Sequence, residues 1–184
     1  MKAILRTAGL ELFDANGYYR TGVREVADRA GCTLPTLYYH YGSKENLFRE
    51  LVYEGYRDLT ARIADQIPQG LSLRDKIYFG VMQCMLLEGE DRLIFRLALK
   101  AMMGLEGPAD IGAEVLTFEL SRPGSINKHA FFGGKPAFSR LVSRVMGEML
   151  ISSLLGGLVP TAEDIAEEID LLMKLSADDP GSGK

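Results

Sequence analysis

The sequence predicts an all-α protein, with a small three-helix N-terminal domain followed by a larger helical domain. Apolar residues recur every three or four positions along most of the 184 residues, which is the spacing of amphipathic helices. No stretch alternates with the period of two that a β-strand would show. The length suits one small and one larger domain, which we place at residues 1–45 and 46–176. We expect residues 177–184 to be a disordered tail.

The first two helices are indicated by apolar spacing and by their terminal residues. We expect a helix over residues 2–16 and a second helix over 22–30. Thr21 can cap the start of the second helix, and Gly31 can adopt the left-handed backbone conformation that ends it. Because the chain begins with an amphipathic helix, we expect no cleaved signal peptide. The inward face of the first helix comprises Ile4, Leu5, Ala8, Leu12 and Phe13.

A very short third helix follows, between Thr33 as its cap and Gly42 as its end. Pro35 stands in the first turn, where its missing N–H costs nothing, and Leu37 falls on the inward side. The side chains left to point away from the core are Leu34, Pro35, Thr36, Tyr39 and His40. Two helices joined by a tight turn, the second presenting its N-terminal residues, form the helix-turn-helix geometry that docks in DNA.

The remaining chain predicts further helices. Ser43 caps a long helix over 44–66, and others follow over 72–88, 91–104 and 108–120, with a loop over 121–136. Large flexible apolar side chains are frequent in these middle helices. They are compatible with a mostly apolar pocket for a small-molecule effector, although side chains of this kind more often belong to the ordinary core. The candidate pocket residues are Phe79, Met82, Met85, Phe95, Met102 and Phe118.

The last two helices, one beginning near residue 138 and one at Thr161, have broad apolar faces. A helix whose apolar surface is wider than one stripe has to bury that surface against neighbours on two sides. Two such helices can pair with their copies across a two-fold axis, so we expect a homodimer. The candidate interface comprises Leu141, Val145, Met149, Ser152, Ile165, Ile169 and Leu172.

Charge and composition narrow the class of protein. The formal net charge is −4, but the first 50 residues carry seven basic and six acidic side chains, leaving −5 for the rest. A weakly basic head on an acidic body suits a protein whose DNA affinity depends on dimerisation. Cys32 and Cys84 are far apart and suggest neither a disulfide framework nor a metal site, and we expect no cofactor. No segment is apolar enough to span a bilayer, so we expect a cytoplasmic protein without membrane contact.

Residues 4–52 also resemble the N-terminal domain of the tetracycline-repressor (TetR/AcrR) family in order and spacing, without a gap. The matching features are Ala8, Leu12-Phe13, Gly17-Tyr18, Val23-Arg24-Glu25-Val26-Ala27, Ala30-Gly31, Pro35-Thr36-Leu37-Tyr38-Tyr39-His40-Tyr41 and Ser43-Lys44-Glu45-Asn46-Leu47. The resemblance covers about a quarter of the chain and implies an all-α regulator that dimerises through its C-terminal helices.

The resemblance implies roles for particular residues. Base edges and adjacent backbone would be contacted by Thr33, Leu34, Pro35, Thr36 and Tyr39. Phosphates would be held by Tyr38, His40 and Lys44, whereas Arg24 would reach a base or a phosphate. Two residues depart from the family pattern: Gly22 replaces a common hydroxyl residue, and Leu34 is apolar where a polar reader is frequent.

Simpler interpretations stay open for several of these residues. Tyr38, Tyr39 and Tyr41 could be core aromatics, whereas His40 and Lys44 could be solvated surface groups. Cys32 is best explained as a small residue of the turn, and His129, which has no second histidine nearby in the sequence, as a loop residue.

We expect a homodimeric, non-enzymatic transcriptional regulator, a repressor released from a palindromic operator by a small apolar or amphipathic effector. The sequence contains no paired carboxylates, no nucleophile beside a base and no metal-ligand spacing that would indicate an enzyme. The alternative is a small-molecule sensor with little DNA affinity, which a gel-shift experiment at low salt would distinguish.

Overall fold

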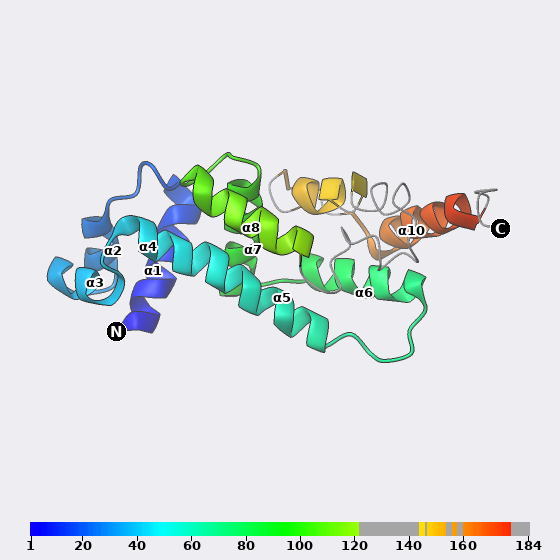
Figure 1. The fold of residues 1–184 in the computed structure, drawn as a ribbon, viewed down its shortest axis with the longest axis horizontal. Coiled ribbons are helices and arrows are strands. Elements are labelled where there is room, and N and C mark those ends of the chain that lie inside the picture. Colours follow the sequence, from blue (N-terminus) through cyan, green and yellow to red (C-terminus); the bar gives the residue numbers. More distant parts are fainter. Residues whose placement is uncertain (122–143, 146, 154–155, 158–159, 178–184) are drawn as a thin grey trace. The chain divides into compact units, whose positions relative to one another are not determined.

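The fold is known from a computed structural model, which describes residues 1–121, 144–145, 147–153, 156–157 and 160–177 (Figure 1). All regular elements within these residues are helices, as the sequence predicts. The remainder of the predicted 121–136 loop, and the predicted tail beyond Ala177, lie outside the described residues. Ala177 itself is the last residue of a helix, so the tail does not begin there.

Compact packing divides the chain differently from the predicted functional boundary at residue 45. One unit comprises Met1–Ala61 and Leu87–Phe118, and the other comprises Arg62–Leu86 and Glu119–Lys184. The first unit therefore contains the predicted DNA-binding head together with two helices that follow much later in the chain. The boundary at residue 45 concerns function and stays a prediction.

Four helices form the head of the first unit: α1 (Lys2–Asn16), α2 (Val23–Arg29), α3 (Leu34–Tyr41) and α4 (Lys44–Arg49). Their bounds agree with the predicted helices, because each is delimited by local signals such as Gly17 and Gly42. The core between them is formed by fully buried apolar side chains, which removes their surfaces from water. These include Leu5, Leu10, Phe13, Val26, Leu37, Leu47 and Phe48.

The predicted continuous α-helix over 44–66 is wrong in its middle. After α4 the chain forms a π-helical segment, η1 (Glu50–Glu54), before α5 (Gly55–Asp65) continues in the same direction. A π turn takes up more residues than an α turn. Accordingly, the buried residues recur in pairs every four positions instead of every 3.6 on average. These pairs are Leu47 and Phe48, Leu51 and Val52, Gly55 and Tyr56, and Leu59 and Thr60.

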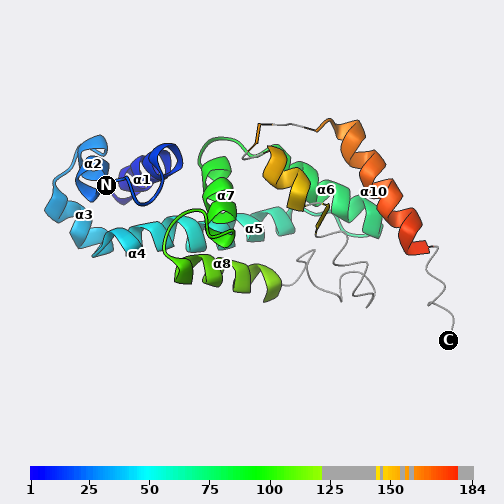
Figure 2. The same cartoon turned by 90° about the horizontal axis from the view of Figure 1, so that it is seen from above.

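The first unit is completed by α7 (Gly89–Met102) and by α8 (Ala109–Ser121) as far as Phe118. Helix α7 packs against α1 and η1. Figure 2 shows α7 crossing the direction of α4 and α5, whereas α8 runs alongside α5. Ion pairs join α7 to α1, because the carboxylate of Asp14 lies 3.3 Å from Arg96 Nε and 3.6 Å from Lys100 Nζ. These contacts bind the head to helices that the sequence predicts as part of the body.

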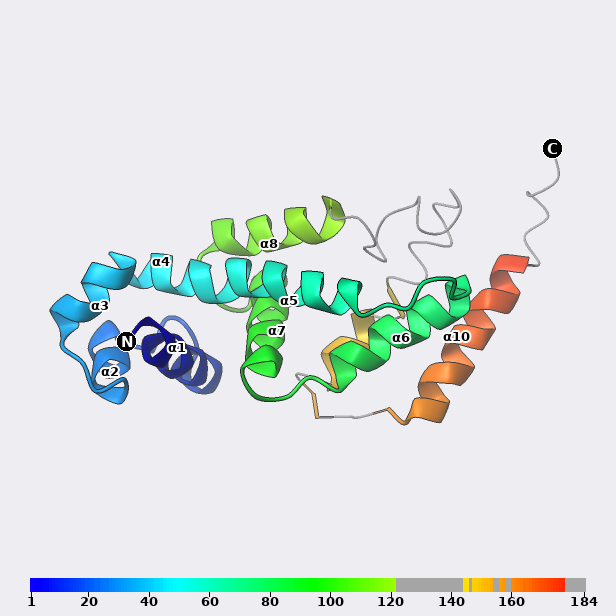
Figure 3. The same cartoon turned by 90° about the horizontal axis from the view of Figure 1, so that it is seen from below.

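In the second unit, α6 (Leu73–Met85) packs against α10 (Ala162–Ala177), and Figure 3 shows both helices clearly. Arg74 Nε lies 2.6 Å from Asp170 Oδ1, which pairs the two helices across their contact. Thr161 and Asp164 form a reciprocal capping box at the start of α10, with the Asp164 N–H donating to the Thr161 hydroxyl at 3.1 Å. This confirms Thr161 as the start signal of the last helix.

Candidate nucleic-acid interface

The turn between α2 and α3 is set by a glycine and by backbone hydrogen bonds. Gly31 adopts a φ of 65°, the left-handed conformation predicted for the end of α2, and the Cys32 N–H donates to the Ala27 carbonyl at 3.0 Å. Thr33 stands at the cap position of α3, but its hydroxyl pairs with the Thr36 hydroxyl at 2.9 Å instead of a backbone N–H. Pro35 occupies the first turn as predicted.

The predicted cap at the start of α2 is wrong. Gly22 holds the cap position, and no side chain accepts a hydrogen bond there. Thr21 is buried instead, where its hydroxyl donates to the carbonyls of Gly17 (2.8 Å) and Leu12 (3.1 Å). Thr21 thus ties the α1–α2 turn to the end of α1, since a buried hydroxyl without a partner would be costly.

Helix α3 separates an inward from an outward face as predicted. Leu37 is fully buried, whereas Tyr39 is 85% exposed and Tyr38 is 44% exposed. Among the other predicted DNA contacts, Arg24, Thr33 and Pro35 are exposed, and Leu34, Thr36 and His40 are half-buried. Tyr38 and Tyr39 are therefore not core residues. These two exposed tyrosines, in the C-terminal half of α3, are available to base edges and phosphates.

Tyr41 belongs to the core instead. It is only 6% exposed, and its hydroxyl donates to the Lys2 carbonyl at 3.3 Å. Burial, assisted by the nearby Glu50 carboxylate, raises the pKa of Tyr41 to about 12. The phenol therefore stays protonated and holds the start of α1 against α3.

The start of α4 presents a lysine beside the α3 face. The Ser43 hydroxyl accepts the Asn46 N–H at 3.0 Å, which confirms the predicted cap. Lys44, the first residue of the helix, places its ammonium 4.3 Å from the centre of the Tyr18 ring. Partial burial lowers the pKa of Lys44. A cation at a helix N-terminus is repelled by the positive end of the helix dipole. A bound anion such as phosphate would offset this repulsion.

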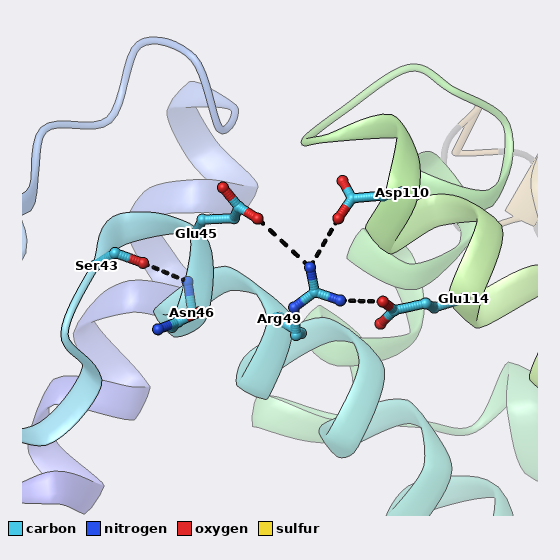
Figure 4. Close-up of polar contacts among 6 residues, drawn as sticks. All are labelled: Ser43, Glu45, Asn46, Arg49, Asp110 and Glu114. Atoms are coloured by element: carbon cyan, nitrogen blue, oxygen red, sulfur yellow. Dashed lines mark hydrogen bonds and ion pairs between the residues drawn. The ribbon is translucent and has the colours of Figure 1, made fainter.

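A cluster of charged side chains fixes the end of α4 to α8. Figure 4 shows the Arg49 guanidinium between three carboxylates: Asp110 at 2.7 Å, Glu45 at 3.4 Å and Glu114. Hydrogen bonds with Glu114 and Asp110 raise the pKa of Arg49 well above its usual range, and the bond with Arg49 lowers the pKa of Asp110. The cluster connects the helix that follows the helix-turn-helix to a helix of the body.

The predicted pocket residues fall into two sets. Phe79, Met82 and Met85 lie three residues apart on α6 in the second unit, and Met85 is buried. Phe95, Met102 and Phe118 belong to the first unit. There the Phe95 and Phe118 rings both contact Tyr56, with ring centres 5.7 and 6.3 Å away. The pocket assignment stays a prediction for each set.

The predicted dimer residues also differ in burial. Ile165, Ile169 and Leu172 are at most 4% exposed within a single chain, on a helix that packs against α6. They therefore have little surface left to offer a partner. Val145 and Ser152 are half-buried, Met149 is 7% exposed, and Leu141 lies outside the described residues. On α10 the exposed apolar side chains are instead Leu171 and Leu175.

Sequence reasoning did not single out three residues that support the interface. Tyr18 belongs to a matching Gly17-Tyr18 pair without a local sign of its role, and Arg49 and Glu106 carry no local signal. Each acts through a partner distant in the sequence, and neither periodicity nor turn chemistry indicates such pairs.

Within the described part of the chain, no three His, Cys, Asp or Glu side chains gather as metal ligands would. None of the described helices has the length and apolar character needed to cross a membrane.

A short helix presenting its N-terminal residues, held by a glycine turn on a supporting helix, defines a helix-turn-helix domain of the DNA-binding class. Residues 5–51 match the sequence profile of the bacterial regulatory proteins of the tetR family. This N-terminal part of the chain is thus similar to a family of regulatory proteins, which are not enzymes.

Two curated relatives match part of the chain. The HTH-type transcriptional activator FasR of Mycolicibacterium smegmatis is 46% identical over 77 residues, which cover 42% of this chain and 35% of that protein. The HTH-type transcriptional regulator LmrA of Bacillus subtilis is 38% identical over 60 residues, covering 32% of each. The aligned region thus spans about a third of the length of these relatives.

Solved structures share the fold over nearly the whole chain. A TetR-like transcriptional regulator from Rhodococcus sp. RHA1 superposes with a TM-score of 0.70 at 19% identity, covering 97% of this chain and 96% of that one. GusR from Salmonella enterica gives a TM-score of 0.63 at 21% identity, covering 94% of each. Likeness at this identity establishes the fold of the helical body.

Proposed function

We propose that this protein is a homodimeric transcriptional regulator that binds a palindromic operator and is released by a small apolar or amphipathic effector, acting as a repressor. The observation that carries the proposal is the outward face of α3, with Leu37 buried beneath it and Tyr39 almost fully exposed. Exposed aromatic side chains leave apolar surface in contact with water, which costs hydrophobic free energy. Tyr38 and Tyr39 are both exposed on α3, shortly before Lys44, and a binding partner best explains this pair.

Two kinds of DNA contact are proposed. The residues that would face base edges are Thr33, Leu34, Pro35, Thr36 and Tyr39. The residues that would hold the DNA backbone are Tyr38, His40 and Lys44, and Arg24 would reach either a base or a phosphate. Phosphate contacts position a protein on the duplex, whereas base contacts carry sequence information. The small positive charge of the first 50 residues supports two heads acting together, because one head neutralises few phosphates.

The sign of regulation depends on where the operator lies relative to the promoter, which the DNA-binding domain does not encode. The relative FasR is named an activator. Activation by the same contacts is therefore the second candidate, and a reporter gene behind the selected operator separates the two by the direction of its response.

We expect the dimer to protect a two-fold symmetric duplex, with recognition helices entering major grooves about 34–36 Å apart or a multiple of that distance.

Lys44→Ala should weaken binding to every sequence alike and reduce the salt-dependence slope by roughly one. Thr36→Ala should instead relax preference at one or two base pairs. The measurements are footprinting and salt titrations on DNA selected from random sequence. Protection without symmetry, or equal effects of both variants on every sequence, contradicts the assigned roles.

An effector should couple to DNA reciprocally. A compound that binds the helical body and prefers one arrangement lowers DNA affinity, and DNA then lowers affinity for the compound by the same factor. We expect a coupling of about 1–3 kcal/mol. The measurement is a thermal-shift screen of apolar compounds, followed by DNA titration with each stabilising compound. If all of them leave DNA affinity unchanged, release by an effector is wrong, while the DNA-binding proposal stands.

A further inference from the structure

Lys44 does not extend freely into solvent in the structure. Its ammonium lies over the face of the Tyr18 ring, 4.3 Å from the ring centre. This distance is well within the range in which the negative face of an aromatic ring attracts a cation. A lysine side chain has four flexible carbons, so holding its end over a ring removes conformational freedom before any phosphate arrives.

Tyr18 is itself held by the aromatic core of the head. Its ring centre lies 4.8 Å from that of Phe48 in an edge-to-face arrangement, and it stacks on Phe13 at 5.9 Å. Phe13 and Phe48 are both fully buried. The ring under Lys44 therefore has one fixed orientation, set by α1 and α4.

The loop between α7 and α8 holds the backbone of the same turn. The Tyr18 N–H donates to the Glu106 carboxylate at 2.9 Å, and the Tyr19 hydroxyl donates to the Gly107 carbonyl at 3.0 Å. Gly17, with a φ of 82°, leaves room for this carboxylate, since a Cβ there would stand 2.6 Å from Glu106 Oε1. The three contacts join residues almost 90 positions apart within one compact unit.

We propose that Tyr18 is a positioning residue for the phosphate contact of Lys44, and that Glu106 of the α7–α8 loop holds Tyr18 in place for that task. The inference rests on the proposed DNA-binding function. The ring holds the ammonium above its face, so less entropy is lost when a phosphate binds. A displacement of the α7–α8 loop would move Tyr18, and through it the phosphate contact, without touching the base-reading residues.

The test compares Tyr18→Phe, which keeps the ring, with Tyr18→Leu, which removes it, in full-length protein on a duplex selected by the wild type. Tyr18→Phe should bind like the wild type. Tyr18→Leu should lose about threefold to tenfold in affinity, the range expected when one long side chain is no longer ordered before the phosphate binds. In a Lys44→Gln background, Tyr18→Leu should have no further effect. Lys174→Gln removes a charge from the second unit and serves as the control for charge alone.

The free protein provides a second measurement that a merely structural role would not change. A proton over an aromatic face is shifted upfield, so the Lys44 ε-methylene signals should be shifted in the wild type and in Tyr18→Phe but not in Tyr18→Leu. Glu106→Gln should reduce both this shift and the affinity, the latter only when Lys44 is present. This variant keeps the aromatic core and supplies the answer if Tyr18→Leu does not fold.

Two outcomes would overturn the inference while leaving DNA binding intact: equal loss of affinity from Tyr18→Leu with and without Lys44, or no upfield shift in the wild type. Failure of the wild type to bind any selected duplex would instead overturn the proposed function itself.

Discussion

Gly112→Ala should destabilise the protein by about 3 kcal/mol, the upper part of the range for overpacking a close contact. Gly112 lies in the first turn of α8, where it approaches the last turn of α7. A Cβ at this position would stand 2.2 Å from the Ala101 carbonyl oxygen and 3.0 Å from its carbon. Both atoms belong to the backbone of α7, so no side-chain rotation can relieve the contact. The two helices have to separate, which also loosens the loop between them.

The measurement is chemical denaturation followed by helical circular dichroism, since the chain has no tryptophan. Gly80→Ala is the matched control, because Gly80 is also helical and a Cβ there meets nothing within 4 Å. That change should be neutral or stabilise by up to ~1 kcal/mol through helix propensity. Equal unfolding free energies for the two variants would show that α7 and α8 do not approach as closely as described.

Phe48→Ala should cost about 3–5 kcal/mol of unfolding free energy, as expected for removing a buried phenylalanine. The side chain is fully buried, with its ring 5.2 Å from Phe13 and 4.8 Å from Tyr18, centre to centre. Gly107 is also adjacent, because a Cβ on it would overlap the Phe48 ring. The change therefore removes the group around which α1, α4 and the α7–α8 loop meet.

Tyr39→Ala provides the contrasting variant. Tyr39 is 85% exposed, so its loss should change the unfolding free energy by less than about 0.5 kcal/mol. If it contacts a base, DNA affinity should fall about tenfold or more. Denaturation curves and gel shifts on both variants separate a core role from a contact role. A stable Phe48→Ala protein, or an unstable Tyr39→Ala protein, would contradict this division of the aromatic residues.

The helix-turn-helix was predictable because its signals are local. Gly31, Pro35, Gly42 and Ser43 each determine the backbone within one turn of themselves, and Leu37 identifies the buried side. The same local reasoning failed for Thr21, whose hydroxyl fits a cap equally well. In the fold, that hydroxyl donates instead to the carbonyl of Leu12 in α1 and to that of Gly17, which follows α1.

The π segment shows a signal that was present but weak. The buried pairs from Leu47 to Thr60 repeat every four residues, which a strict α-helix cannot keep on one face over four turns. Amphipathic patterns tolerate such drift over a short window, so the spacing by itself did not predict the wider turn. Contact with α7 along η1 makes the buried face continuous.

The sequence by itself determined the helical class, the bounds of the N-terminal helices and the outward face of α3, because spacing and capping act between residues close in the chain. Only the tertiary structure decided that α7 and α8 belong with the head, that Arg49 and Tyr18 have partners in or beside α8, and that Ile165, Ile169 and Leu172 face inward. These outcomes depend on which amphipathic faces meet. Many pairings of such faces bury similar apolar area, so close packing and charge pairing between distant residues make the choice.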